Sequence, residues 1–145
     1  MNARPVPTLR AHYRHFLELQ TRWSDNDAYA HVNNVVYYSY FDTVVNEYLL
    51  SRKVLDVQRS PVIGVVAETQ CNFFAALAFP QRLCAGLRVA RLGESSVHYE
   101  IGIFAADAEQ SAAAGRFVHV YVDRASRLPV SLPAELRAAL EELQP

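Results

Sequence analysis

The segment DNDAYAHVNN, which begins at Asp25, gathers carboxylate, imidazole and amide side chains directly ahead of a long apolar run. Asp25 and Asp27 are spaced as D-x-D, and His31 and the pair Asn33 and Asn34 follow. Aspartate and asparagine are common in turns and at helix N-caps, so either asparagine is expected to cap a helix. One cap leaves the other polar side chains unused, and they favour a chemical role for this segment.

A helix that starts here would supply what carbonyl chemistry needs. The first turn of a helix has backbone N–H groups without partners and a partial positive charge. Such groups can polarise a carbonyl oxygen, as an oxyanion hole does. A carboxylate a few residues upstream can then activate water or attack the carbonyl carbon itself. The arrangement therefore predicts acyl transfer.

Metal sites fit the same residues less well. A calcium-binding EF-hand loop beginning at Asp25 would need a glycine sixth and a glutamate twelfth, where this chain has Ala30 and Val36. A transition-metal site made of Asp25, Asp27 and His31 lacks a second histidine nearby. We expect no metal and no cofactor.

Motifs of nucleophilic or phosphate chemistry are missing from the sequence. There is no G-x-S-x-G elbow and no glycine-rich phosphate loop. Cys71 and Cys84 fall in strand patterns without a neighbouring histidine, and they form no disulfide framework. His98 and His119 also fall in strand patterns, where a histidine is more often a packed or surface residue than a ligand.

The composition describes a single globular domain. Of the 145 residues, 51% are hydrophobic and 20% are charged, and the formal net charge is −1. Without a basic run, a nucleic-acid partner is not expected. The apolar stretch at residues 73–79 is far too short to span a membrane, and the N-terminus lacks a signal-peptide core. We expect a cytoplasmic protein without a membrane partner.

The apolar periodicity predicts the elements that position the polar segment. Residues 15–22 alternate as a strand does, and residues 34–52 follow as a helix. Polar residues form only a narrow stripe on that helix, so other structure is expected to surround the rest of it. The stripe consists of Ser39, Asp42, Thr43, Asn46 and Glu47.

Four more strands and a short helix are predicted after Pro61. The strand patterns cover residues 63–72, 82–92, 96–103 and 115–124. Residues 134–143 have the pattern of a short amphipathic helix. Consecutive strands with hairpin-like links imply an antiparallel sheet whose concave face buries the long helix, which is an α+β class. We expect residues 1–12 to be a flexible lead and residues 13–145 to be one domain.

The stretch RWSDNDAYAHVNNVVYYSYFDTVVNEYL resembles the hot-dog-fold acyl-CoA thioesterases, specifically the 4-hydroxybenzoyl-CoA thioesterase-like group. The pattern of that group runs from an aromatic residue through D-x-D and an H-V-N-N-like segment into a long central helix. RLGESSVHYEIGIF and GRFVHVYVDRASRLPVSLP are similar to its later strands. The resemblance implies a hot-dog fold: a five-stranded antiparallel sheet wrapped around one long central helix, with a short C-terminal helix.

The resemblance also implies hydrolysis of an acyl-CoA to a free acid and coenzyme A. Asp27, the second aspartate of D-x-D, is the expected catalytic carboxylate, as general base or as nucleophile. Asn34 would open the helix, and its backbone N–H would polarise the thioester carbonyl. The family usually has glycine where this chain has Ala30, and a glycine there indicates a positive φ or a close backbone approach.

Members of that family pair into a continuous sheet with the active site at the dimer interface, and they often form tetramers. By this resemblance we expect a homodimer that assembles into a homotetramer. His31, Asn33, Tyr37 and the strand residue Glu68 are the expected substrate-binding residues, with Glu68 reaching the site of the other protomer.

Two other functions remain open on the sequence. A hot-dog dehydratase or hydratase would use His31 together with Asp27. A non-catalytic acyl-thioester binding protein would keep the scaffold without turnover, and the departure at Ala30 favours it.

Overall fold

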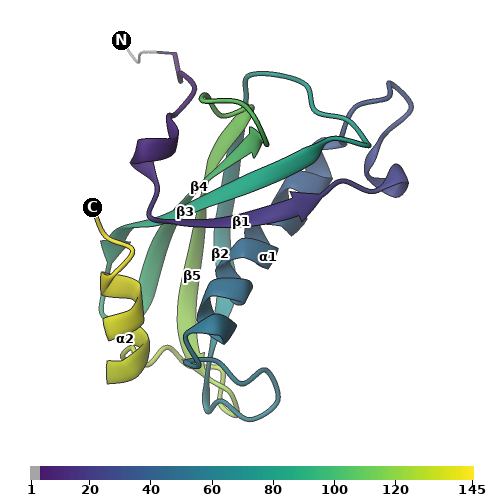
Figure 1. Ribbon diagram of the computed structural model, residues 1–145. Coiled ribbons are helices and arrows are strands. Elements are labelled where there is room, and N and C mark those ends of the chain that lie inside the picture. The colour runs from purple at the N-terminus through teal and green to yellow at the C-terminus, as the bar shows by residue number, and fades with distance from the viewer. Residues whose placement is uncertain (1–3) are drawn as a thin grey trace.

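The computed structural model describes residues 4–145, so the first three residues of the expected lead lie outside the described residues. A five-stranded antiparallel sheet packs against one long helix, and a short helix follows at the C-terminus (Figure 1). The strands are β1 (His15–Gln20), β2 (Val62–Phe73), β3 (Arg82–Leu92), β4 (Ser96–Ala105) and β5 (Ala113–Asp123), and the helices are α1 (Asn34–Ser51) and α2 (Ala134–Glu141). The expected α+β class and its seven elements are confirmed.

The strands are ordered β1-β3-β4-β5-β2 in the sheet. The links β3–β4 and β4–β5 are hairpins between neighbours, as predicted. The prediction of a hairpin-like link is wrong for β2 and β3, because β2 pairs with β5 and β3 pairs with β1. Residues 74–81 cross between the two halves of the sheet instead. Their Leu77 is buried, and its carbonyl accepts a 2.7 Å hydrogen bond from the Val32 N–H, which docks the crossing beside the start of α1.

α1 is held by burial rather than by its intrinsic preference for a helix. Its buried residues are Tyr37, Tyr40, Phe41, Val44, Val45, Tyr48 and Leu49. Most are β-branched or aromatic, and such residues are mediocre helix formers. Fully burying a large apolar side chain stabilises the fold by about 1.5–3 kcal/mol, which outweighs those preferences. The predicted polar stripe lies on the exposed side. In the part of the chain that the structure describes, no helix is long and apolar enough to cross a membrane.

One hydrophobic core joins both helices to the sheet. α1 packs on β3 and β1, and α2 packs on β3. From α2 and the residues after it come Leu136, Leu140 and Leu143, each at most 5% exposed. The core therefore anchors α1 along its length and leaves its N-terminal end at the polar loop.

β2 is an edge strand that is open along its middle. Residues 64–69 are exposed, including Val65 at 37% and Val66 at 51%. The register with β5 shifts between Val66 and Glu68, which marks a β-bulge. A long exposed edge with apolar side chains is a natural place for another strand to pair.

Residues 8–13 lie on the other face of the sheet. The Thr8 hydroxyl lies 2.9 Å from both the Tyr13 hydroxyl and Ser111 Oγ, and Arg10 Nε donates to the Ala108 carbonyl at 2.8 Å. The Tyr13 ring lies over Gly102, where a Cβ would come within 2.6 Å of it. These contacts dock the end of the expected lead, whose flexibility stays a prediction.

Candidate active site at the start of the long helix

The loop between β1 and α1 folds back on itself just before the helix. A 3₁₀ turn, η2 (Trp23–Asp25), opens it, and Asn26 and Val32 then form an isolated antiparallel bridge. The Asp27 N–H donates to the His31 carbonyl at 2.8 Å, which closes a tight loop. The fold-back places the D-x-D pair and the histidine beside the first turn of α1.

Asp25 is the anchor of this loop. Its carboxylate is fully buried and accepts hydrogen bonds from the Arg22 N–H at 2.9 Å, from the Arg22 guanidinium at 2.8 and 3.0 Å, and from the Tyr40 hydroxyl at 2.8 Å. Burial by itself would raise the pKa of Asp25, but the hydrogen bonds from Arg22 and Tyr40 outweigh it and lower the pKa below 3.8. The same burial and the bond to Asp25 raise the pKa of Tyr40. Asp25 therefore has a structural role, which is to hold the loop in place.

Asp27 is half-buried and keeps one carboxylate oxygen free. Its Oδ1 accepts the Tyr29 N–H at 2.9 Å, and its carbonyl accepts the Ala30 N–H at 3.0 Å. Its Oδ2 has no hydrogen-bond partner within residues 4–145. The turn orients the carboxylate, and the free oxygen remains able to take a proton or to attack a carbon.

Ala30 adopts a left-handed backbone, with φ at 63°. This is the positive φ that a glycine at this position indicated. A residue with a Cβ is strained in this region, by roughly 1–2 kcal/mol. The loop nevertheless keeps its shape, because the Asp27–His31 bond and the Asn26–Val32 bridge hold both sides of the turn.

Asn33 is the N-cap of α1, and Asn34 is its first helical residue. Asn33 Oδ1 accepts the Val35 N–H at 3.1 Å, and the Asn33 N–H donates to the Asp25 carbonyl at 2.9 Å. The Asn34 N–H has no protein acceptor among the described residues. It is one of the free donors that the start of a helix offers.

A hollow of about 350 Å³ opens at this helix start. It is lined by His31, Val32, Asn34, Tyr37, Phe73, Phe74, Ala75, Ala76 and Leu77. Most of these are apolar and come from the end of β2 and the crossing that follows it. Asp27 does not line the hollow, but it is hydrogen-bonded to His31, which does. An apolar group can therefore lie here with its polar end at the Asn34 N–H.

Tyr37 forms one wall of the hollow. Its ring packs edge-on against Phe73 at 4.9 Å between centroids, and the residue is 2% exposed. Burial raises the pKa of Tyr37 to about 12, so it keeps its proton at neutral pH. Its hydroxyl forms no hydrogen bond within the described part of the chain and is available to a ligand.

The expected site residues are not all in one place. Asp27, His31, Asn33, Asn34 and Tyr37 meet where the loop joins the helix. Glu68 lies elsewhere, on the open stretch of β2, where it forms a 2.8 Å ion pair with Arg116. Within one chain Glu68 does not line the hollow, so its role as a substrate-binding residue stays a prediction.

Some residues of this site went unpredicted. The apolar run at residues 73–77 supplies most of the wall, and its only signal was hydrophobicity, which core packing explains as well. Arg22 and Asp25 are three positions apart, but no spacing rule connects Asp25 with Tyr40, whose hydroxyl also binds its carboxylate. No cluster of three or more potential metal ligands occurs in residues 4–145.

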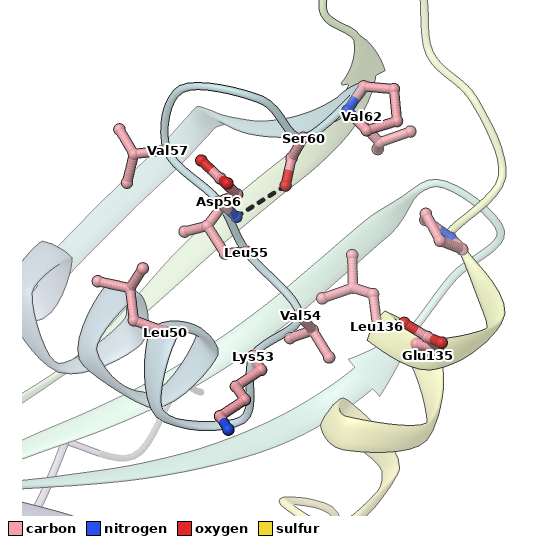
Figure 2. A pocket seen from close by; sticks show the side chains of 12 residues that line it. Leu50, Lys53, Val54, Leu55, Asp56, Val57, Ser60, Val62, Glu135 and Leu136 are labelled. Carbon is pink, nitrogen blue, oxygen red and sulfur yellow. Dashed lines mark hydrogen bonds between the residues drawn. The ribbon is translucent and has the colours of Figure 1, made fainter.

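A larger hollow, of about 610 Å³, lies at the opposite end of α1, between the loop that follows the helix and α2 (Figure 2). The acidic loop residue there is used in a turn: Asp56 Oδ1 accepts the N–H groups of Gln58 and Arg59, and the Asp56 N–H donates to Ser60 Oγ at 2.8 Å. The larger hollow therefore offers no free carboxylate from this loop, in contrast to Asp27 at the other end of α1.

Comparison with curated proteins adds one distant relative. The uncharacterized protein YsmA of Bacillus subtilis (strain 168) is 25% identical over 97 residues, which are 66% of this chain. The chain spans 65% of the length of that relative.

Two solved structures share the fold over most of the chain. The PA5185 protein of Pseudomonas aeruginosa strain PAO1 is 55% identical, with a TM-score of 0.94 over 96% of this chain and 97% of that one. Slr0204 of Synechocystis, a 1,4-dihydroxy-2-naphthoyl-CoA thioesterase, is 20% identical, with a TM-score of 0.80 over 88% and 96%. The hot-dog fold is thereby confirmed. The family model of the thioesterase-like superfamily matches residues 21–140, and the chain belongs to that superfamily.

Proposed function

We propose that this protein hydrolyses the thioester bond of an acyl-CoA, with Asp27 as the catalytic carboxylate and the Asn34 N–H as the donor to the thioester carbonyl. The observation that carries the proposal is the loop closure that holds both groups at one helix start. Membership of the thioesterase-like superfamily supports it, and so does the fold shared with a CoA thioesterase.

Each step of the proposed reaction is assigned to a group at this helix start. The carbonyl oxygen accepts the Asn34 N–H, and the helix N-terminus stabilises the negative charge that develops on it. As a general base, Asp27 removes a proton from the attacking water, and the tetrahedral intermediate then breaks its carbon–sulfur bond to give the free acid. As a nucleophile, Asp27 attacks the carbonyl carbon, the carbon–sulfur bond breaks to leave an anhydride, and water then cleaves that anhydride. In both routes the sulfur leaves as the thiolate of coenzyme A and takes up a proton.

The hollow beside Asn34 suits the apolar part of the substrate. We assign His31 and the Tyr37 hydroxyl to contacts with the substrate, since both line the hollow. Asn33 uses its Oδ1 as the helix cap, which leaves its side-chain NH₂ group for the substrate. The protein is expected to act in the cytoplasm and to need no cofactor.

Assembly would complete the site. Two copies related by a two-fold axis pair the same strand antiparallel, and the open edge of β2 is suited to this pairing. The middle of β2, with Glu68, would then lie toward the helix start of the other copy. This supports a homodimer, and the resemblance to the family extends the proposal to a homotetramer.

The test is thiol release from a panel of acyl-CoA substrates by the wild type and by Asp27→Asn. Loss of a general base lowers turnover by about 10²–10⁴-fold. The control is Asp107→Asn, which neutralises an exposed carboxylate in a turn away from the site. Asp27→Asn that folds and still turns over at the wild-type rate contradicts the assignment.

One observation keeps the binding-protein alternative in view: the strained φ of Ala30 lies in the same turn as Asp27. Tight binding of an acyl-CoA without any thiol release would favour that function. The dehydratase alternative has less support, because Asp27 and His31 are joined through backbone atoms, and no side-chain bond joins them in the described residues.

A further inference from the structure

Trp23 and Phe79 form an exposed aromatic pair that the proposed reaction does not use. Trp23 is 77% exposed and Phe79 is 37% exposed. Their ring centroids lie 6.0 Å apart with the ring planes at 88°, and this T-shaped contact leaves at least one face of the Trp23 ring open. Tryptophan is highly buried on average in folded proteins, so a tryptophan this exposed indicates a surface that binds something.

The pair continues the alignment of β1 and β3 beyond the two strands. The strand register ends where Gln20 pairs with Arg82, and the Thr21 hydroxyl donates to a carbonyl of the opposite segment at 2.6 Å. Trp23 and Phe79 follow three positions further along each segment. β1 and β2 are the two opposite edges of the sheet, so a second copy that pairs along β2 would leave the aromatic pair open.

The pair lies next to the loop that carries Asp27. The Phe79 N–H donates to Asn26 Oδ1 at 3.0 Å, and Asn26 directly precedes Asp27. Two residues before Phe79, Leu77 lines the hollow at the helix start. The crossing therefore leads from the proposed acyl pocket, past the loop of the proposed catalytic carboxylate, to the aromatic pair.

Arg82 supplies a free positive charge near this pair. It is exposed, and its guanidinium has no hydrogen-bond or ion-pair partner within residues 4–145. Arg82 is three positions from Phe79, which is at most about 10 Å of chain at about 3.3 Å per residue. An open aromatic face with an arginine close by is the combination that binds a base together with its phosphates.

The substrate of the proposed function carries such a group. Its thioester carbonyl lies at the Asn34 N–H and its acyl group in the hollow, so the coenzyme A half extends out of the hollow. That half ends in an adenine base and negatively charged phosphates. We propose that Trp23 stacks on the adenine of the acyl-CoA substrate and that Arg82 binds one of its phosphates. This inference rests on the proposed function and adds the residues that select a CoA thioester over a thioester without a nucleotide.

The size of the surface favours a nucleotide over a macromolecule. A stable protein–protein interface takes about 800 Å² from each partner. The surface here consists of two rings and one arginine at the end of the sheet, which matches one base and its phosphates.

The first test uses the fluorescence of Trp23, which is the only tryptophan of the chain. The whole protein is titrated with ADP, which contains the base and two phosphates. Pyrophosphate, which has the charges and no base, and pantetheine, which has the arm alone, are the matched ligands. We expect saturable quenching by ADP and none by the other two. Fluorescence that ADP leaves unchanged would overturn the proposal, also where it responds to protein concentration or to lipid vesicles instead.

The charge is tested by Arg82→Gln, which leaves Trp23 in place as the reporter. We expect its affinity for ADP to fall about twofold to fivefold, as the loss of an exposed ion pair allows. Arg91→Gln is the control, because Arg91 is an exposed cation near the other end of β3. Equal losses in both variants would show that Arg82 has no specific contact with the phosphates.

The second test compares hydrolysis of one acyl group carried on coenzyme A and on pantetheine. Trp23→Leu should raise KM about fivefold to 100-fold for the CoA thioester, which is the effect of losing one base–aromatic stack, and leave its kcat unchanged. Trp23→Phe keeps an aromatic face and should raise KM less. Neither variant should change KM for the pantetheine thioester. Equal changes for both substrates would overturn the proposal, since Trp23 would then only support the loop.

The two proposals fail separately in these tests. A protein that hydrolyses no thioester but shows the quenching by ADP fails the proposed function and keeps the nucleotide site. A protein that hydrolyses both thioesters with equal KM and shows no quenching keeps the proposed function and overturns the nucleotide site.

Discussion

The Tyr40 hydroxyl donates a 2.8 Å hydrogen bond to the buried carboxylate of Asp25. This bond joins the second turn of α1 to the loop that carries Asp27. Because the Asp25 carbonyl also accepts the Asn33 N–H, the loop and the helix start are tied at two points. The free Asn34 N–H and the free oxygen of Asp27 depend on this frame for their relative position.

Tyr40→Phe should weaken that frame without leaving a large void. A hydrogen bond to a charged group contributes about 1.5–3 kcal/mol, so we expect the free energy of unfolding to fall by about 2 kcal/mol. Urea denaturation measures it. Tyr38→Phe is the control, since Tyr38 is half-buried and its hydroxyl has no partner in the described residues. Equal losses in both variants would show that the Asp25 bond contributes nothing particular.

Asn34→Pro tests the role of the backbone N–H directly. Proline is favoured at the first position of a helix, and the extended backbone of Asn33, with ψ at 141°, accommodates a following proline. The variant should fold, yet lose about 10²–10³-fold in kcat, the usual effect of removing one oxyanion donor. Asn34→Ala, which keeps the N–H, should retain activity. Full activity of the folded proline variant would remove Asn34 from the mechanism.

Ala30→Gly should stabilise the protein. The positive φ of Ala30 is unfavourable for a residue with a Cβ and free of strain for glycine. After the greater entropy of glycine in the unfolded chain is subtracted, we expect a gain of about 0.5–1 kcal/mol in thermal or urea unfolding. Ala28→Gly is the control, because its φ is negative and it should gain nothing. A destabilised Ala30→Gly would mean that the strain is absent.

Stability should fall with acid in a window set by His119. The pKa of His119 is about 4 in the folded protein and 6.5 in the unfolded chain, so the unfolded state binds more protons between these values. The contribution is complete above pH 6.5 and is lost as the pH falls toward 4, up to about 3 kcal/mol at 1.36 kcal/mol per unit. The pKa of Asp25 is lowered from 3.8 in the folded protein, so its contribution to stability is lost at lower pH, as the pH falls through 3.8 and below.

Urea denaturation across pH 4–7 measures this slope, with His119→Phe as the comparison. The variant has no imidazole to protonate, so its curve should be nearly flat in the same window. Parallel curves for the two proteins would show that His119 is protonated as easily in the folded state as in the unfolded chain.

Patterns local to the sequence predicted the helices, the strands and the segment proposed as the active site. The strand alternation, the narrow polar stripe of α1 and the cap at Asn33 are local patterns, since each depends on residues a few positions apart. The resemblance of the D-x-D and HVNN stretch then pointed to Asp27 and Asn34, and the expected α+β hot-dog fold is confirmed.

Which of these side chains keep unpaired atoms depends on tertiary contacts. Asp25 and Asp27 have the same side chain two positions apart, and the distant Tyr40 helps to bury one while the other keeps an open oxygen. The crossing from β2 to β3, the wall of the hollow and the unpaired ring of His119 likewise depend on contacts between residues far apart in the chain. Such contacts have no period in the sequence, because packing free energy depends on which surfaces meet and not on their spacing along the chain.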